Sequence, residues 1–374
     1  MAETPYKEKE YGVGIAGYGF IGKVHAYAYK TIPFYYDDLP AKIKLIGVSA
    51  HSEESRKKAI KQAGFEFATS DYMELVKNKS ICIINCCLPN NLHYELVKAA
   101  ILEGKHVYCD KPLAINTEQA ENLTNLAENS NVKTQIVFQL RFFPAVIRAK
   151  QIIDNGFLGK INFFRFLYLH SSCVKQSSKP YSWKAEFEKV GGGVLVDLGS
   201  HIIDLARYLV GEFKSVYAEV RNFTSPDKRT DDLALINAEI VSGATGILEA
   251  SKIATGTNDE VRFEIYGSEG AVAFNSMEPN WLWAYSMKDP DNPVGGFRGY
   301  KKIETVQKYP DATGIPLQKF SIGWIRTHVA CLHSFLHSVM YNETPQPSFK
   351  DGLAVQKIIE AAYNSARDQT RVEL

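Results

Sequence analysis

Residues 11–29 have the sequence Y-G-V-G-I-A-G-Y-G-F-I-G-K-V-H-A-Y-A-Y, and the rest of the chain is placed relative to them. The stretch predicts a buried strand, a tight glycine turn and the start of a helix. Gly17, Gly19 and Gly22 have the G-x-G-x-x-G spacing: the first permits a tight turn, the second lets backbone approach a pyrophosphate, and the third lets helix pack on strand. The N–H groups at the helix N-terminus then face the phosphates. The predicted dinucleotide contacts of this turn are Gly17, Gly19, Phe20, Ile21 and Gly22.

Length and composition limit the class of protein. The chain has 374 residues, 45% hydrophobic and 23% charged, which is ordinary globular composition but too long for one core, so we expect two domains. The 43 lysines and arginines balance 42 acidic residues without a basic run, so nucleic acid is not an expected partner. The first ten residues are polar, and no apolar run reaches the roughly 18 residues of a membrane span. We expect a cytoplasmic protein with no membrane contact.

No metal site is predicted. The six cysteines lack paired C-x-x-C spacing and four of them fall in predicted buried strands or at their ends, so we expect reduced core residues rather than disulfides or zinc ligands. They are Cys82, Cys86, Cys87, Cys109, Cys173 and Cys331. On a later helix, His333 and His337 are four apart, as metal ligands can be, and His328 precedes them. With no third ligand in register, these histidines indicate a solvated helix face.

The end of the second predicted strand, residues 43–48, bears on the choice of cofactor. In dinucleotide folds an acidic residue here accepts the ribose hydroxyls of NAD. This chain continues V-S-A-H-S-E-E-S-R, with no carboxylate directly after the strand. Ser49, His51 and Arg56 are predicted cofactor contacts that could meet a 2′-phosphate, so NAD and NADP both stay open.

Strand and helix then alternate, with predicted strands at 81–88, 106–109 and 134–139. This order predicts an N-terminal Rossmann domain, a doubly wound parallel sheet spanning residues 1–141, with ligands at the carboxyl ends of the strands. The segments P-N-N-L-H and Asp110-Lys111-Pro112 follow two of those ends. The predicted cofactor contacts in this part of the chain are Leu88, Pro89, Asn90, His93, Asp110, Lys111 and Arg141.

Residues 142–374 are predicted to form an α+β domain. After a helix at 144–155, apolar residues alternate along 161–170, 216–221, 233–240, 246–252 and 261–266, which indicates a large, mostly antiparallel open sheet. The segment G-G-G-V-L-V-D-L-G-S-H-I-I-D interrupts these strands with a helix on which Asp197, His201 and Asp204 share one face. One face of the sheet has no helices in sequence to cover it, so we expect a homodimer or homotetramer.

Two side chains could carry proton transfer. Lys111 is held by Pro112 at a strand end, where a nearby nicotinamide would lie, and His201 could exchange a proton with a substrate hydroxyl while Asp197 or Asp204 fixes its tautomer. A surface lysine and a structural histidine are the alternatives. Tyr168 and His170 point to one strand face and could line a sugar pocket, although such aromatic faces often serve packing.

These motifs together resemble the glucose-fructose oxidoreductase, inositol dehydrogenase and MocA-type oxidoreductases. The resemblance rests on G-Y-G-F-I-G, P-N-N-L-H, G-K-H-V-Y-C-D-K-P-L, G-G-G-x-x-x-D-x-G-x-H-x-x-D and P-S-F-K-D-G-L, which span nearly the whole chain. It implies that Lys111, Asp197 and His201 line the substrate site. Asp110 stands where glutamate is usual. Within the family, the long first connection and the G-G-F-R stretch are most similar to sugar or polyol dehydrogenases of the levoglucosan and inositol type.

The resemblance implies NAD(P)-dependent hydride transfer with a secondary alcohol of a sugar, anhydrosugar or polyol. Lys111 and His201 would handle the proton, Asp197 would bind a hydroxyl, and Tyr168 and His170 would complete the substrate contacts. Two alternatives stay open on the same fold: an NAD-dependent glycosidase with a redox-elimination cycle, and a catalytically silent dinucleotide sensor. Retention of Lys111 and His201 argues against the sensor, which needs neither proton carrier.

Overall fold

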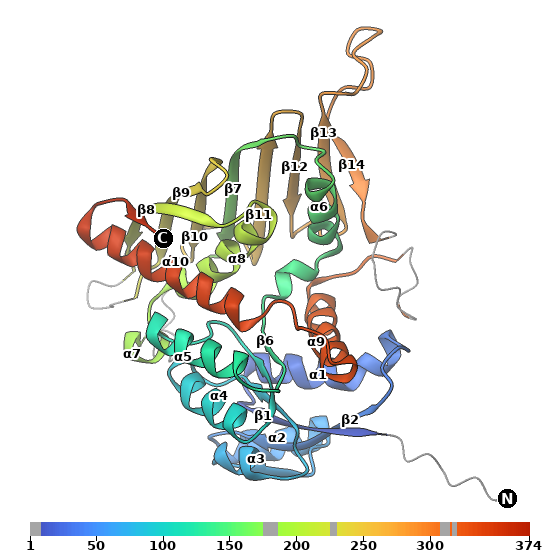
Figure 1. The fold of residues 1–374 in the computed structure, drawn as a ribbon, viewed down its shortest axis with the longest axis vertical. Helices are drawn as coiled ribbons and strands as arrows, with labels where there is room; N and C mark the ends of the chain where they lie inside the picture. The colour runs from blue at the N-terminus through green and yellow to red at the C-terminus, as the bar shows by residue number, and fades with distance from the viewer. Residues whose placement is uncertain (1–8, 175–185, 225–229, 307–314, 316–319) are drawn as a thin grey trace, which may run out of the picture.

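The computed structural model describes residues 9–174, 186–224, 230–306, 315 and 320–374. Two sheets organise these residues, a six-stranded sheet near the N-terminus and a nine-stranded sheet in the C-terminal part (Figure 1). This confirms the predicted fold class of a Rossmann domain followed by an α+β domain. In the described residues, no helix is both long and apolar enough to span a bilayer.

The first sheet is parallel throughout, in the order β3-β2-β1-β4-β5-β6. Its central strands are buried along their length because helices cover both faces, as in doubly wound folds. The strands are β1 (Glu10–Ala16), β2 (Lys42–Ser49), β3 (Phe67–Thr69), β4 (Ile83–Cys86), β5 (His106–Cys109) and β6 (Thr134–Ile136). The helical segments are α1 (Phe20–Tyr35), α2 (Glu53–Ala63), α3 (Met73–Lys77), η1 (Asn90–Leu92), α4 (His93–Leu102), α5 (Thr117–Glu128) and η2 (Gln139–Phe142).

The second sheet has the order β14-β13-β12-β11-β7-β10-β9-β8-β15. All neighbouring pairs are antiparallel except β7 and β10, which run parallel because a long crossover separates them in the chain. The strands are β7 (Ile161–Leu169), β8 (Phe213–Arg221), β9 (Leu233–Ile240), β10 (Thr245–Ser251), β11 (Glu260–Gly267), β12 (Gly270–Asn275), β13 (Trp281–Ser286), β14 (Lys301–Glu304) and β15 (Val372–Glu373). The sequence pattern located β7 to β11 within three residues and missed β12 to β15.

One face of the second sheet is covered by helices, and Figure 1 shows α6, α8 and α10 in front of the strands. The helical segments of this part are α6 (Pro144–Asp154), α7 (Phe187–Val190), η4 (Leu195–Gly199), α8 (Ser200–Leu209), α9 (Trp324–Tyr341) and α10 (Phe349–Asp368). Burial along β9 and β10 alternates, so every second side chain faces this helical layer. Among the described residues, the helices that pack against this sheet lie on one face of it, as expected from the sequence.

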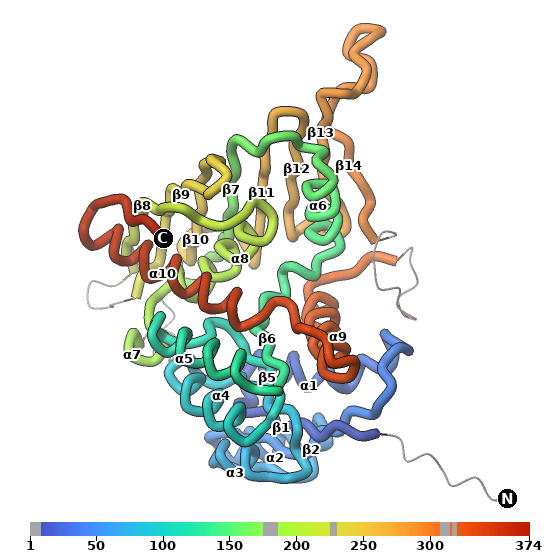
Figure 2. Tube along the Cα trace, in the orientation of Figure 1, coloured from blue at the N-terminus to red at the C-terminus, as the bar shows by residue number. Residues whose placement is uncertain are grey.

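Helix α9 crosses back to the first domain and packs against α1, as the tube in Figure 2 makes visible. Its apolar side chains, among them Val329, Leu332 and Phe335, share a core cluster with residues of α1 and β1. Residues far beyond the predicted boundary at 141 therefore share a core with the N-terminal sheet. The predicted solvated histidine face is wrong, because His328 and His333 are buried against the first domain, where His333 stacks on Tyr36.

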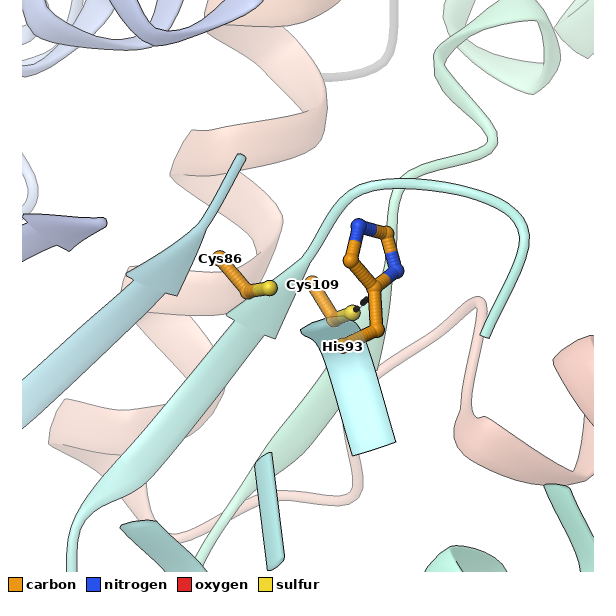
Figure 3. A group of neighbouring side chains, drawn as sticks. All are labelled: Cys86, His93 and Cys109. Carbon is orange, nitrogen blue, oxygen red and sulfur yellow. Dashed lines mark hydrogen bonds between the residues drawn. The ribbon is translucent and has the colours of Figure 1, made fainter. Parts of the chain in front are cut away.

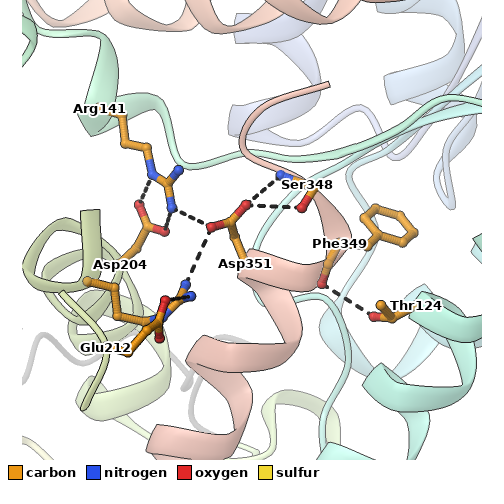
Figure 4. A network of polar contacts seen from close by, with 8 residues as sticks. Thr124, Arg141, Asp204, Glu212, Ser348, Phe349 and Asp351 are labelled. Carbon is orange, nitrogen blue, oxygen red and sulfur yellow. Dashed lines mark hydrogen bonds and ion pairs between the residues drawn. The ribbon is translucent and has the colours of Figure 1, made fainter. Parts of the chain in front are cut away.

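A buried ion-pair network joins η2, α8 and α10 (Figure 4). Arg141 donates from Nε to Asp204 Oδ2 at 2.8 Å and from Nη2 to Asp351 at 2.9 Å. Asp351 also accepts from Ser348 at the start of α10, and Arg207 contributes a further cation. Burial raises the pKa of Asp204 to about 6 in spite of the opposing Arg141 charge. The network holds α8, which carries the predicted histidine, in a set position relative to the first domain.

Candidate functional site

A cleft of about 1880 Å³ runs between the carboxyl ends of the first sheet and the helical face of the second. This volume exceeds the roughly 300–1,000 Å³ of a site for one small ligand. One end is lined by the glycine turn after β1 and the other by residues of β7, η4 and α8. The cleft therefore has room for a dinucleotide and a second small molecule side by side.

The glycine turn fits a dinucleotide. Gly17 has φ of +97°, and a Cβ there would lie 2.3 Å from the Cys87 carbonyl oxygen, so only glycine is accommodated. Its N–H donates to the Ser49 carbonyl at 2.9 Å, which ties the turn to the end of β2. Gly19 has open space where its Cβ would be, so a phosphate can approach the backbone at the N-terminus of α1. The residues present thus match the binding of a pyrophosphate.

The third glycine has a packing role. A Cβ on Gly22 would lie 2.0 Å from the Gly17 carbonyl oxygen, so its absence lets α1 pack closely against the turn. Gly22 therefore supports the turn without lining the cleft.

At the end of β2, Ser49 and His51 line the cleft as predicted, whereas Arg56 does not. The Arg56 guanidinium turns back and donates from Nη1 to the carbonyls of Ala50 and His51, both at 2.8 Å. Arg56 instead fixes the backbone that carries His51.

Most predicted contact residues lie where the sequence placed them. Those that line the cleft are Gly17, Gly19, Phe20, Ile21, Ser49, His51, Leu88, Pro89, Asn90, Asp110, Lys111, Tyr168, His170, Asp197 and His201. Gly22, Arg56, His93 and Arg141 do not. For Arg141 the reason is the buried pairing with Asp204 and Asp351.

His93 lies behind the cleft wall, at the start of α4. It is 1% exposed, with Nδ1 2.8 Å from the Pro112 carbonyl oxygen and Nε2 2.9 Å from that of Leu88. These contacts tie together the loops that follow β4 and β5. In this structure His93 does not line the cleft, whereas Leu88 and Pro112, whose carbonyls it contacts, both do.

The centre of the cleft holds the Asp197 side chain between two lysine side chains. Asp197 accepts from Lys111 Nζ at 3.0 Å on one oxygen and from Lys252 Nζ at 2.9 Å on the other. Lys111 also donates to the Asp197 carbonyl oxygen. Burial lowers the pKa of Lys252, but the Asp197 charge outweighs it and the pKa is raised on balance, so Lys252 is an ammonium group. The three side chains are thus mutually oriented and largely shielded from solvent.

His201, one helical turn after Asp197, is 6% exposed and lines the same cleft. Its ring lies 5.8 Å from that of Tyr168, whose hydroxyl donates to Asp259 at 2.7 Å. Asp204, a further turn along, is fully engaged by Arg141, so Asp204 does not orient His201. An imidazole, two lysines and a carboxylate thus converge where a hydroxyl-bearing ligand can bind and exchange a proton.

Among the cleft residues that were not predicted from the sequence are Lys252, Trp324 and His328. Lys252 follows β10, and no motif distinguishes it from a surface lysine. Trp324 stacks on Phe20 with ring centroids 5.9 Å apart, and His328 lies 4.4 Å from Trp324. Burial, together with the neighbouring His25, holds the pKa of His328 well below its usual range, so its ring is neutral. These α9 residues reach the cleft only because α9 packs on α1.

Comparison with known proteins agrees with this geometry. Residues 11–138 match the profile described as "Oxidoreductase family, NAD-binding Rossmann fold", and residues 150–374 match "Oxidoreductase family, C-terminal alpha/beta domain". Levoglucosan dehydrogenase of Pseudarthrobacter phenanthrenivorans is 31% identical across 97% of each chain. Myo-inositol 2-dehydrogenase of Thermotoga maritima is 26% identical across 97% of this chain and 98% of its own. A levoglucosan dehydrogenase structure with NADH and levoglucosan superposes with a TM-score of 0.92 at 32% identity, covering 98% of this chain and 99% of that one.

Proposed function

The chain belongs to the glucose-fructose oxidoreductase, inositol dehydrogenase and MocA-type (GFO/IDH/MocA) oxidoreductase family, and from this premise we propose that it oxidises a secondary alcohol of a sugar, anhydrosugar or polyol. It is an NAD-binding oxidoreductase of the sugar and inositol dehydrogenase type. The observation that carries the proposed substrate class is the cluster of Lys111, Asp197, Lys252 and His201 facing the glycine turn across one cleft. Hydroxyl-rich molecules suit such a set of charged donors and acceptors.

The proposed mechanism assigns proton handling to the chain's own residues. The substrate hydroxyl lies between Lys111 and His201, and one of them removes its proton as the carbon loses a hydride. Asp197 holds Lys111 in place, and Lys252 holds Asp197. NAD⁺, when bound at the glycine turn, supplies the hydride acceptor at C4 of its nicotinamide. Tyr168 and His170, at the end of β7, form the wall of the substrate pocket on the side of the second sheet.

A screen of anhydrosugars, sugars and inositols with NAD⁺ and with NADP⁺, which follows the absorbance of the reduced cofactor, tests the proposed alcohol oxidation. Lys111→Met and His201→Ala should each remove most of the roughly 100- to 10,000-fold contributed by acid–base catalysis. The double variant should be little worse than the worse single one, because groups acting on one proton transfer are non-additive.

Lys214→Met and His337→Ala are matched controls, since both side chains contact glutamate carboxyl groups outside the cleft. Near-wild-type turnover in Lys111→Met or His201→Ala would remove that residue from the mechanism. Turnover of glycosides without any release of reduced cofactor would favour the redox-elimination glycosidase instead.

We also propose that the chain forms a homodimer or homotetramer through the face of the second sheet that its own helices leave free. Half-buried and exposed apolar side chains such as Phe163, Leu167 and Ile247 lie on strands of this sheet. Light scattering at micromolar concentration tests this, and a monomeric mass would refute it.

A further inference from the structure

We propose that Cys86, His93 and Cys109 form a binding site for one thiophilic divalent cation of the Zn²⁺ class, beneath the wall of the cleft. The three residues come from the end of β4, the start of α4 and the end of β5, and Figure 3 shows their side chains pointing toward one another. Their ligand atoms all lie within 4.8 Å of one another, and all three residues are buried. Their positions in sequence match no zinc motif, so only the fold brings them together.

The distances match a zinc site. With Zn–S of about 2.3 Å and Zn–N of about 2.0 Å at tetrahedral angles, a sulfur and a nitrogen ligand stand roughly 3.5 Å apart and two sulfurs roughly 3.8 Å. Cys109 Sγ lies 3.7 Å from His93 Nδ1. Cys86 and Cys109 are register partners on neighbouring parallel strands, so their side chains leave the sheet on the same face. All three ligand atoms lie within 4.8 Å of one another, so a cation would draw the more distant of them together by up to about 1 Å.

The surroundings supply the usual support for a metal-binding histidine. A ligating histidine normally donates its second ring N–H to a carbonyl or carboxylate. With Nδ1 on the cation, Nε2–H of His93 donates to the Leu88 carbonyl oxygen, which already lies 2.9 Å away. The contact of Nδ1 with the Pro112 carbonyl oxygen is the one that the cation replaces.

The ligand set selects the class of cation. Two thiolates and one imidazole are soft or borderline donors, which favour Zn²⁺ over Mg²⁺ or Ca²⁺, because the last two prefer oxygen ligands. Two thiolates also neutralise the charge of a divalent cation in a buried site. The cation would join the loops that follow β4 and β5, the second of which carries Lys111 next to Pro112.

The test uses the full-length protein, reduced and freed of metal with a chelator, and titrated with Co²⁺ and then Zn²⁺. We expect one cation per chain by native mass spectrometry, a thiolate-to-cobalt charge-transfer band that Zn²⁺ abolishes, and a rise in Tm with Zn²⁺. Cys86→Ser and Cys109→Ser should each weaken Zn²⁺ binding at least about 10- to 100-fold. Mg²⁺ at the same concentration should leave the Tm unchanged.

Cys82→Ser is the matched control, because the Cys82 thiol donates to the Gly12 carbonyl oxygen and lies outside the cluster. It should bind Zn²⁺ as the wild type does. Absence of a charge-transfer band in the wild type, or unchanged Zn²⁺ affinity in Cys86→Ser and Cys109→Ser, overturns the proposal. The wild-type spectrum decides the matter even where a serine variant folds poorly.

Discussion

Replacing Lys252 by methionine should impair turnover while sparing cofactor binding. Lys252 Nζ lies 2.9 Å from one oxygen of Asp197, and the two side chains are 14% and 23% exposed. Breaking a fully buried ion pair by removing one partner costs about 3–5 kcal/mol. Asp197 keeps Lys111 at 3.0 Å and some solvent, so we expect a smaller loss of transition-state stabilisation, about 1–2 kcal/mol. That corresponds to a roughly 5- to 30-fold lower kcat/KM.

The assay measures kcat/KM on the best substrate of the screen and, separately, the Kd of NADH by fluorescence. Lys252→Arg keeps the charge and should lose less than Lys252→Met. Lys214→Met, which removes a lysine ion pair on β8 outside the cleft, should match the wild type. The Kd of NADH should hold within about twofold, since Lys252 belongs to the second domain. A kcat/KM of Lys252→Met within twofold of wild type would refute the role of Lys252 in orienting Asp197.

Three further predictions concern the turn, the network and pH. Gly17→Ala should raise the Kd of NADH at least about 10-fold, because the backbone there has φ of +97° and the alanine Cβ would lie 2.3 Å from the Cys87 carbonyl oxygen. An unchanged Kd would argue against this turn as the phosphate site. Arg141→Met leaves the Asp204 carboxylate, 1% exposed, without its main partner and should lower the free energy of unfolding in urea by about 3–5 kcal/mol; a loss below 1 kcal/mol would contradict this. Burial lowers the pKa of His25 from 6.5 to about 4, so unfolding takes up a proton between those values. The free energy of unfolding contributed by neutral His25 is therefore complete above pH 6.5 and falls by up to about 3 kcal/mol toward pH 4. Measured by urea unfolding, His25→Gln should lose less stability than the wild type over this pH range. Equal losses in the two proteins would exclude His25 as the source.

Much of the site could be predicted from the sequence because its signals are local. The spacing of Gly17, Gly19 and Gly22 predicts a backbone conformation directly. Only glycine accepts the positive φ at Gly17 and the close backbone approaches at Gly17 and Gly22. Lys111 follows the end of a strand, which determines the edge of the sheet at which it lies. His201 lies four residues after Asp197 on a predicted helix, which determines the helix face that the two share. The strands from β7 to β11 were visible for the same reason, because alternation over seven or more residues is a strong pattern.

The residues that the sequence did not reveal depend on contacts between distant segments. Lys252 reaches the cleft because β10 packs against η4, which brings its Nζ within 2.9 Å of Asp197, 55 positions earlier in the chain. Arg141 looked like a cofactor contact at a strand end, but Asp204 and Asp351, each more than 60 residues away, take up its guanidinium. His93 and Cys109 approach Cys86 through strand register and helix packing. A local pattern determines backbone conformation and which face a side chain is on, whereas the partner that a buried charge or thiol meets is decided by tertiary packing, because burial requires each polar group to find whichever partner the fold brings within reach.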